Sequence, residues 1–116
     1  MQVNGYTIEN DAHLAGADLA GANLKRTALT GADLRGANLK RADICGANLR
    51  FAILINANLT HADLEGTMLM GANLESADLA HASLIYAELF KANIEGTNLT
   101  HTNLHMATMP DGSIHD

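Results

Sequence analysis

A five-residue repeat runs through most of this chain and limits the folds open to it. Twenty consecutive blocks, from Ala12 to Asp111, keep one register without a break. The third residue of each block, here called the anchor, is Leu in seventeen blocks. The residue two positions before the anchor is Ala in sixteen blocks and Thr in four. Such self-similarity predicts a repeat architecture in which each block packs against its neighbours.

The period of five does not fit a helix or a single strand. A helix needs apolar residues about every 3.6 positions, and anchors spaced by five would face every side of it. Successive anchors of a strand would point to opposite faces. A chain that turns a corner in every block would instead direct each anchor, and the small residue before it, inward. We therefore expect a core filled by stacked Leu and Ala side chains, without an internal ligand cavity.

Two further positions of the block carry turn signals. Gly stands two residues after the anchor in eight blocks, which accounts for eight of the ten glycines in the chain. Asn or Asp precedes the anchor in thirteen blocks. Glycine is favoured where the backbone needs steric freedom, and short polar side chains hydrogen-bond to nearby backbone in turns.

The blocks, typified by Ala17–Gly21, Ala32–Gly36 and Ala72–Ser76, read A-(D/N)-L-x-x, and the chain resembles the pentapeptide-repeat family over residues 12–111. The resemblance implies an all-β fold, a right-handed quadrilateral β-helix with four blocks per coil and about five coils. Residues twenty apart would then stack at about 4.8 Å, and the repeat region would be roughly 25 Å long. We expect residues 1–11 and 112–116 to form short terminal caps. Because the family is especially abundant in cyanobacteria, such a source is also implied.

Charge is divided unevenly along the chain, whose formal net charge is -6. Residues 1–50 carry six bases and five acids, net +1, whereas residues 51–116 carry one base and eight acids, net -7. The few bases and the lack of interleaved aromatic residues argue against direct nucleic-acid binding. No apolar run approaches the ~20 residues of a membrane span, and no signal peptide is visible. With Cys45 as the lone cysteine, these features favour a cytoplasmic protein.

The outward positions suggest an apolar band across the middle and later coils. Contiguous apolar surface is typical of interfaces, although scattered surface apolar residues are also normal. We predict a protein-binding surface formed by nine residues: Phe51, Ile53, Ile55, Met68, Met70, Ile85, Tyr86, Phe90 and Met106.

Three histidines are spaced twenty residues apart and would stack in one column along the coils. They are candidates for a transition-metal site: His61, His81 and His101. They lack a fourth ligand, so a solvent-exposed ladder of imidazole rings is the competing interpretation. No catalytic residue set is visible, since the Asp residues before the anchors already have a role in turns. We expect no catalytic site, no metal site and no cofactor.

Taken together, the sequence predicts a non-enzymatic structural scaffold that mediates protein–protein interaction with an unidentified protein partner, as a monomer or weak homodimer. The resemblance also offers an alternative, a DNA-mimic inhibitor of a type II topoisomerase, because some members of the family mimic an acidic duplex. The six bases in the first half argue against that alternative. A third possibility is head-to-tail assembly between the oppositely charged halves, which salt would weaken.

Overall fold

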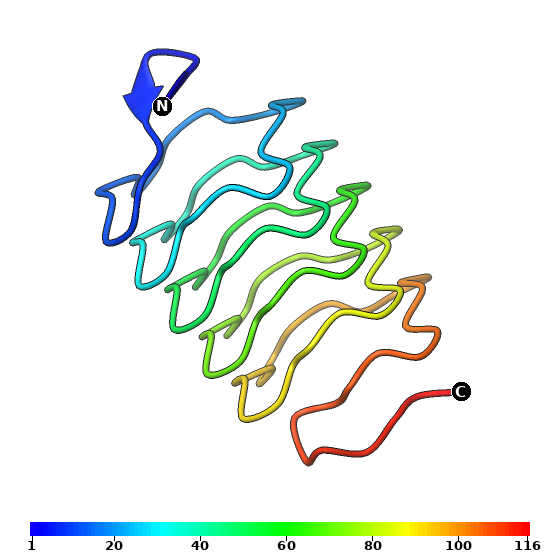
Figure 1. The fold of residues 1–116 in the computed structure, drawn as a ribbon. Coiled ribbons are helices and arrows are strands. Elements are labelled where there is room, and N and C mark those ends of the chain that lie inside the picture. The colour runs from blue at the N-terminus through cyan, green and yellow to red at the C-terminus, as the bar shows by residue number, and fades with distance from the viewer.

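The computed structural model describes residues 1–116 and is a right-handed, four-sided β-helix (Figure 1). Its coils stack along one axis, with an N-terminal hairpin at one end and the C-terminal tail at the other. Parallel β-bridges join residues twenty positions apart, such as Asp33 with Ile53 and Ile53 with Asn73. The predicted fold class is thereby confirmed.

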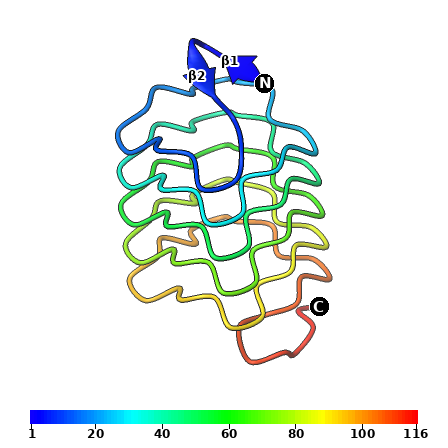
Figure 2. The same ribbon diagram turned by 60° about the vertical axis from the view of Figure 1, so that its left-hand side comes forward.

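Each coil has four sides, which we number by their anchors. Side 1 contains Leu14, side 2 contains Leu19, side 3 contains Leu24 and side 4 contains Leu29, and each side recurs every twenty residues. The two residues after each anchor form a turn, which makes the corner to the next side. Equivalent corners of successive coils lie above one another (Figure 2).

Backbone hydrogen bonds hold neighbouring coils together in the same way on every side. The N–H of Leu34 donates to the carbonyl of Ile53 at 2.8 Å, and the N–H of Ile53 donates to the carbonyl of Ala32 at 2.9 Å. Within the corner, the N–H of Ala37 donates to the carbonyl of Leu34 at 3.0 Å. Because buried backbone groups need partners, this repeated ladder explains why a strict period of five is kept.

The corners show the predicted turn chemistry. The carboxylate of Asp18 accepts a hydrogen bond from the N–H of Ala20 at 3.2 Å, and the amide oxygen of Asn58 accepts one from the N–H of Thr60 at 3.0 Å. The second residue after the anchor has a φ between 56° and 71° in nineteen of the twenty blocks. This left-handed conformation explains the preference for glycine there.

Leu and Ala fill the interior, as the sequence predicts. Most anchors are at most 2% exposed, and the small residues before them pack in the same cluster. Each buried Leu contributes about 1.5–3 kcal/mol before entropy is counted. Thr67 replaces Ala in one block and remains buried because its hydroxyl donates to the carbonyl of Ile44 at 2.9 Å. Anchors of the last coil are only half-buried: Ile94, Leu99, Leu104 and Met109.

The N-terminal residues cover the first coil with a hairpin of strands β1 (Gln2–Val3) and β2 (Tyr6–Thr7). The turn between them uses Asn4 and Gly5, whose φ values of 52° and 82° suit the Asn-Gly hairpin turn. Ile8 is buried against the core, and the Tyr6 hydroxyl accepts a hydrogen bond from the N–H of Asp18 at 3.3 Å.

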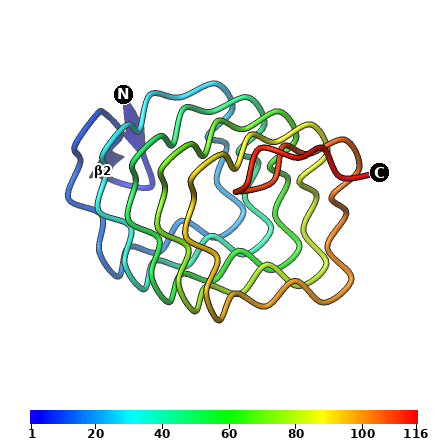
Figure 3. The same cartoon turned by 90° about the horizontal axis from the view of Figure 1, so that it is seen from below.

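The C-terminal tail folds back beneath side 4, where Thr108 and Ile114 form an antiparallel bridge (Figure 3). The Ile114 side chain nevertheless stays 54% exposed, so the tail covers the backbone of the last coil better than its apolar interior. The longest extent of the molecule is 38 Å. It exceeds the roughly 25 Å expected for five coils because the hairpin and the tail lengthen both ends.

Candidate functional site

Side 4, its two corners and the tail beneath it carry most of the exposed large hydrophobic residues. Six large hydrophobic residues of the chain are exposed, and five of them flank this side or lie in the tail beneath it. Phe51 and Phe90 stand at the corner between sides 4 and 1, and Tyr86 and Met106 stand at the corner between sides 3 and 4. Ile114 lies in the tail and forms an isolated β-bridge with Thr108 of side 4. Such one-sided clustering is not expected of scattered surface residues.

Three of the half-buried residues in the predicted surface lie on side 4 or at its corners. Met68 lies in the middle of side 4, Met70 at the corner with Phe51 and Phe90, and Ile85 beside Tyr86. These residues join the exposed ones in one surface, which we call the side-4 surface and define by eight residues: Phe51, Met68, Met70, Ile85, Tyr86, Phe90, Met106 and Ile114.

Two of the predicted residues lie apart from the side-4 surface. Ile53 is in the middle of side 1, next to the corner of Phe51. Ile55 is at the corner between sides 1 and 2, so a whole side separates it from the side-4 surface. Both residues are half-buried. The structure therefore does not bring Ile55 together with the other members of the band.

Three members of the side-4 surface occupy strained backbone positions. Phe51, Tyr86 and Met106 have φ values of 60°, 59° and 58°. For residues other than glycine, the left-handed conformation costs about 1–2 kcal/mol each. Because eight blocks place Gly at the same position, large side chains there are not required by the fold. Eleven non-glycine residues share this conformation, so the strain belongs to the turn itself and is not specific to the side-4 surface.

Local contacts hold the aromatic side chains of the corner in place. The ring of Phe51 lies over Gly71, where an added Cβ would approach the ring to 2.6 Å. The Lys91 ammonium lies 5.3 Å from the centroid of the Phe90 ring, within the range of a cation–π contact. The Arg50 guanidinium donates to the Met68 sulfur at 3.3 Å.

Sequence reasoning missed three residues of this site: Arg50, Lys91 and Ile114. Arg50 and Lys91 share the corner of Phe51 and Phe90, and neither forms an ion pair with a carboxylate. The stacking of residues twenty positions apart, which placed Phe51 and Phe90, also places Arg50 and Lys91 at this corner. The sequence alone could therefore have identified both cations. For Ile114, the turn signal of Pro110, Asp111 and Gly112 predicts a tail that folds back over the last coil, but it does not assign this residue to side 4.

The histidine column forms a ladder of stacked rings. The centroids of His61 and His81 are 4.9 Å apart with 5° between the ring planes, and those of His81 and His101 are 5.0 Å apart with 26°. Face-to-face rings direct their nitrogens sideways instead of toward a common point, and these residues do not form a metal-holding cluster. Desolvation within the stack, together with the charges of Arg41 and His81, lowers the pKa of His61 below 6.5.

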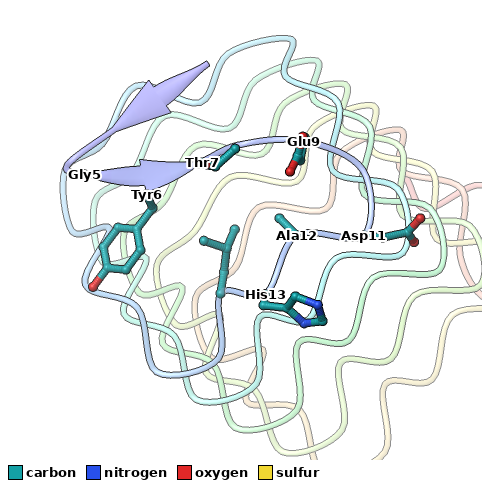
Figure 4. A pocket seen from close by; sticks show the side chains of 8 residues that line it. Gly5, Tyr6, Thr7, Glu9, Asp11, Ala12 and His13 are labelled. Carbon is teal, nitrogen blue, oxygen red and sulfur yellow. The ribbon is translucent and has the colours of Figure 1, made fainter.

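A pocket of about 420 Å³ lies between the N-terminal hairpin and the first coil (Figure 4). Tyr6 and Thr7 of β2 line it from one side, and His13 lines it from the other. Glu9 contributes a carboxylate, whereas the Asp11 side chain is directed away from the pocket. No group of three or more His, Cys, Asp or Glu residues is arranged to hold a metal ion here or elsewhere in the chain.

Cys45 shows no sign of activation as a nucleophile. Desolvation, followed by the charges of Asp63, Glu65 and Asp43, raises the pKa of its thiol above the usual 9.0. A thiolate is the reactive form, and these surroundings disfavour it. The structure also contains no helix long and apolar enough to cross a membrane.

Comparison with known proteins agrees with this architecture. The family model for pentapeptide repeats matches residues 10–44, 32–69 and 68–105. The structure of HetL, a pentapeptide repeat protein involved in heterocyst differentiation regulation from Nostoc sp. strain PCC 7120, superposes with a TM-score of 0.89. The two chains are 39% identical over 91% of this chain and 50% of HetL, so this chain spans half of that protein.

A second solved structure is also similar. The pentapeptide repeat protein alr5209 from Nostoc PCC 7120 gives a TM-score of 0.68 and 38% identity, over 77% of this chain and 81% of that protein. No curated protein sequence matches the chain. The unbroken period, the four-sided coil, the family match and these two structures together show that the chain belongs to the pentapeptide-repeat family.

Proposed function

We propose that this protein is a non-enzymatic scaffold that binds another protein through the side-4 surface. The observation that carries the proposal is the gathering of five of the six exposed large hydrophobic residues around one side of the rod. Aromatic residues and methionine are enriched in the cores of protein interfaces.

One of the two similar proteins has a stated regulatory role. HetL is involved in the regulation of heterocyst differentiation, and we infer for this chain a regulatory role exerted through binding. A solenoid with a filled core has only its outer sides and ends for contact with other molecules. Among the outer sides, side 4 has the largest set of exposed apolar groups.

The DNA-mimic alternative finds less support in the charge distribution. A mimic of duplex DNA needs carboxylates that are free to face a basic groove. Here Asp43 pairs with Lys25 at 3.4 Å, and Asp33 pairs with Arg35 at 2.6 Å. These two pairs neutralise two of the three carboxylates in the first two coils, and only Asp18 is left there without an ion pair.

Affinity capture with charge-matched variants tests the proposal. The double variant Met70→Asp/Phe90→Asp introduces two charges into the side-4 surface, and we expect it to lose the bound protein. Its control, Ala15→Asp/Ala20→Asp, introduces the same charges at exposed positions away from side 4. Mass spectrometry identifies the captured proteins, and thermal unfolding verifies that both variants are folded. Identical capture by the wild type and the side-4 variant would refute the proposal.

A further inference from the structure

The side-4 surface combines apolar groups with charges that have no intramolecular ion-pair partner. Arg50 and Lys91 lie two coils apart at the corner between sides 4 and 1. Glu88 lies in the middle of side 4, and Asp111 is at the same corner one coil beyond Lys91. None of these four residues takes part in an ion pair. The surface therefore offers two cations and two carboxylates to whatever covers it.

We propose that the side-4 surface binds the same surface of a second copy of this chain, with the two rods antiparallel about a two-fold axis. The inference rests on the proposed function, because it assigns an occupant to the same surface. In such a dimer each contact occurs twice, since one patch must complement itself. The two-fold axis lies in the plane of the interface and runs across the rods, perpendicular to their long axes. Each corner therefore faces the same corner of the second copy.

Charge selects the register of the two rods. If the axis passes between the third and fourth coils, the second coil of one rod faces the fifth coil of the other. Arg50 then faces Asp111 of the second copy, and this attraction occurs twice. If the axis instead passes through the third coil, Arg50 faces Lys91 of the second copy, and like charges repel. Opposed like charges are an effective means of excluding a wrong register.

The opposite corner supports the same register by shape. Tyr86, in the fourth coil, then faces Gly66 in the third coil of the second copy. The Tyr86 side chain is 56% exposed, and no atom lies within 4 Å of where a Cβ on Gly66 would be. The ring of one copy can therefore occupy the open space beside the glycine of the other. Phe90 and Met70 meet across the interface at the first corner in the same register.

The size of the surface sets the strength of the association. The smallest extent of the molecule is 22 Å, so a side at most that wide and four coils long covers no more than roughly 400 Å² per copy at a coil spacing of about 4.8 Å. The total falls below the ~1,200 Å² buried by standard specific interfaces. We therefore expect a weak, reversible dimer whose population depends on concentration.

Sedimentation equilibrium of the full chain, from about 1 µM to about 1 mM, measures this association directly. The wild type is expected to shift from monomer toward dimer within that range. Arg50→Asp alone, and Asp111→Arg alone, should each weaken the dimer about tenfold or more, because each places like charges opposite one another. The double variant Arg50→Asp/Asp111→Arg should restore it.

The rescue separates a contact from a folding defect, because Asp111 also accepts hydrogen bonds from Ser113 and its loss alone can disturb the tail. A wild type that stays monomeric at the highest concentration overturns the proposal. A dimer that survives both single variants, or a double variant that stays as weak as the single ones, overturns it as well.

This result is distinguishable from failure of the proposed function. If the chain is monomeric but the Met70→Asp/Phe90→Asp variant loses a captured protein, the self-association fails while the scaffold function stands. If the chain dimerises with the expected rescue and captures no other protein, the self-association stands and the binding of a different protein fails.

Discussion

At the scale of single residues, the second position after each anchor combines a backbone conformation that favours glycine with side chains that are often larger. Nineteen of these twenty residues have positive φ, although only eight of them are glycine. Large side chains at this position cost backbone energy and reach furthest from the rod. Phe51 partly offsets that cost, because its ring packs on Gly71 of the next coil.

The contact between Phe51 and Gly71 can be isolated with a matched pair of substitutions. Gly71→Ala and Gly66→Ala introduce the same methyl group at φ values of 68° and 65°. Only the first methyl meets a neighbour, the Phe51 ring at 2.6 Å, so Gly71→Ala should destabilise more, by about 1 kcal/mol or more. Urea unfolding measures both. In a Phe51→Gly background the two alanine variants should become equal, and a persistent difference would contradict the assigned contact.

Backbone strain at Tyr86 predicts that glycine is more stable than alanine at this position, the reverse of the usual order. Tyr86→Ala and Tyr86→Gly both remove the ring, but only the alanine variant keeps a Cβ at a φ of 59°. The glycine variant should therefore be the more stable of the two by about 1 kcal/mol, even though glycine usually destabilises folded chains. Thermal unfolding of the two variants decides this, and a more stable alanine variant would show that the corner is not strained.

At the scale of the element, the column is the unit that organises the surface. Residues twenty apart stack, so a property repeated along the sequence becomes a continuous stripe on the rod. The histidine ladder is one such stripe, and its ring spacings of 4.9 and 5.0 Å follow from the spacing of the coils. Desolvation within the stack, followed by the charges of Arg41 and His81, disfavours positive charge on His61 and lowers its pKa.

The lowered pKa of His61 has a defined consequence for stability. In the folded chain His61 binds a proton less readily than in the unfolded chain, whose ordinary pKa is 6.5. Its stabilising contribution is therefore complete above pH 6.5 and is lost as the pH falls through the folded pKa. Nuclear magnetic resonance should give His61 a titration midpoint below 6.5, and Arg41→Gly should raise it. A midpoint at or above 6.5 would contradict the stacked arrangement.

At the scale of the whole molecule, how far the sequence predicts the structure depends on the distance from the ends. In the middle coils every block has a neighbour above and below, so the repeat alone predicts the inward direction of residues such as Leu54 and Ala52. The ends lack such neighbours. The pocket beside His13 and the exposed side chain of Ile114 were not predictable for that reason.

The candidate site was predictable to a similar degree. The columns placed Met68, Met70 and Phe90 on one face with Phe51 at its far corner, and in the structure Phe51, Met70 and Phe90 share the corner between sides 4 and 1. The columns also placed Ile53 and Ile55 on the adjoining side, and the structure leaves Ile55 a whole side away from the side-4 surface. Whether these residues bind a partner remains a prediction.

Site-specific photo-crosslinking tests the central claim, that side 4 is a docking surface, most directly. A photoreactive phenylalanine analogue at Phe51 or Tyr86 keeps an aromatic ring where one already stands, and the same analogue at Ala15 or Ala20 serves as control. Our account predicts that irradiation in native lysate links the side-4 positions to a defined protein, or to a second copy of this chain, whereas the control positions give no such product. Equal crosslinking at all four positions, or none at side 4, would contradict it.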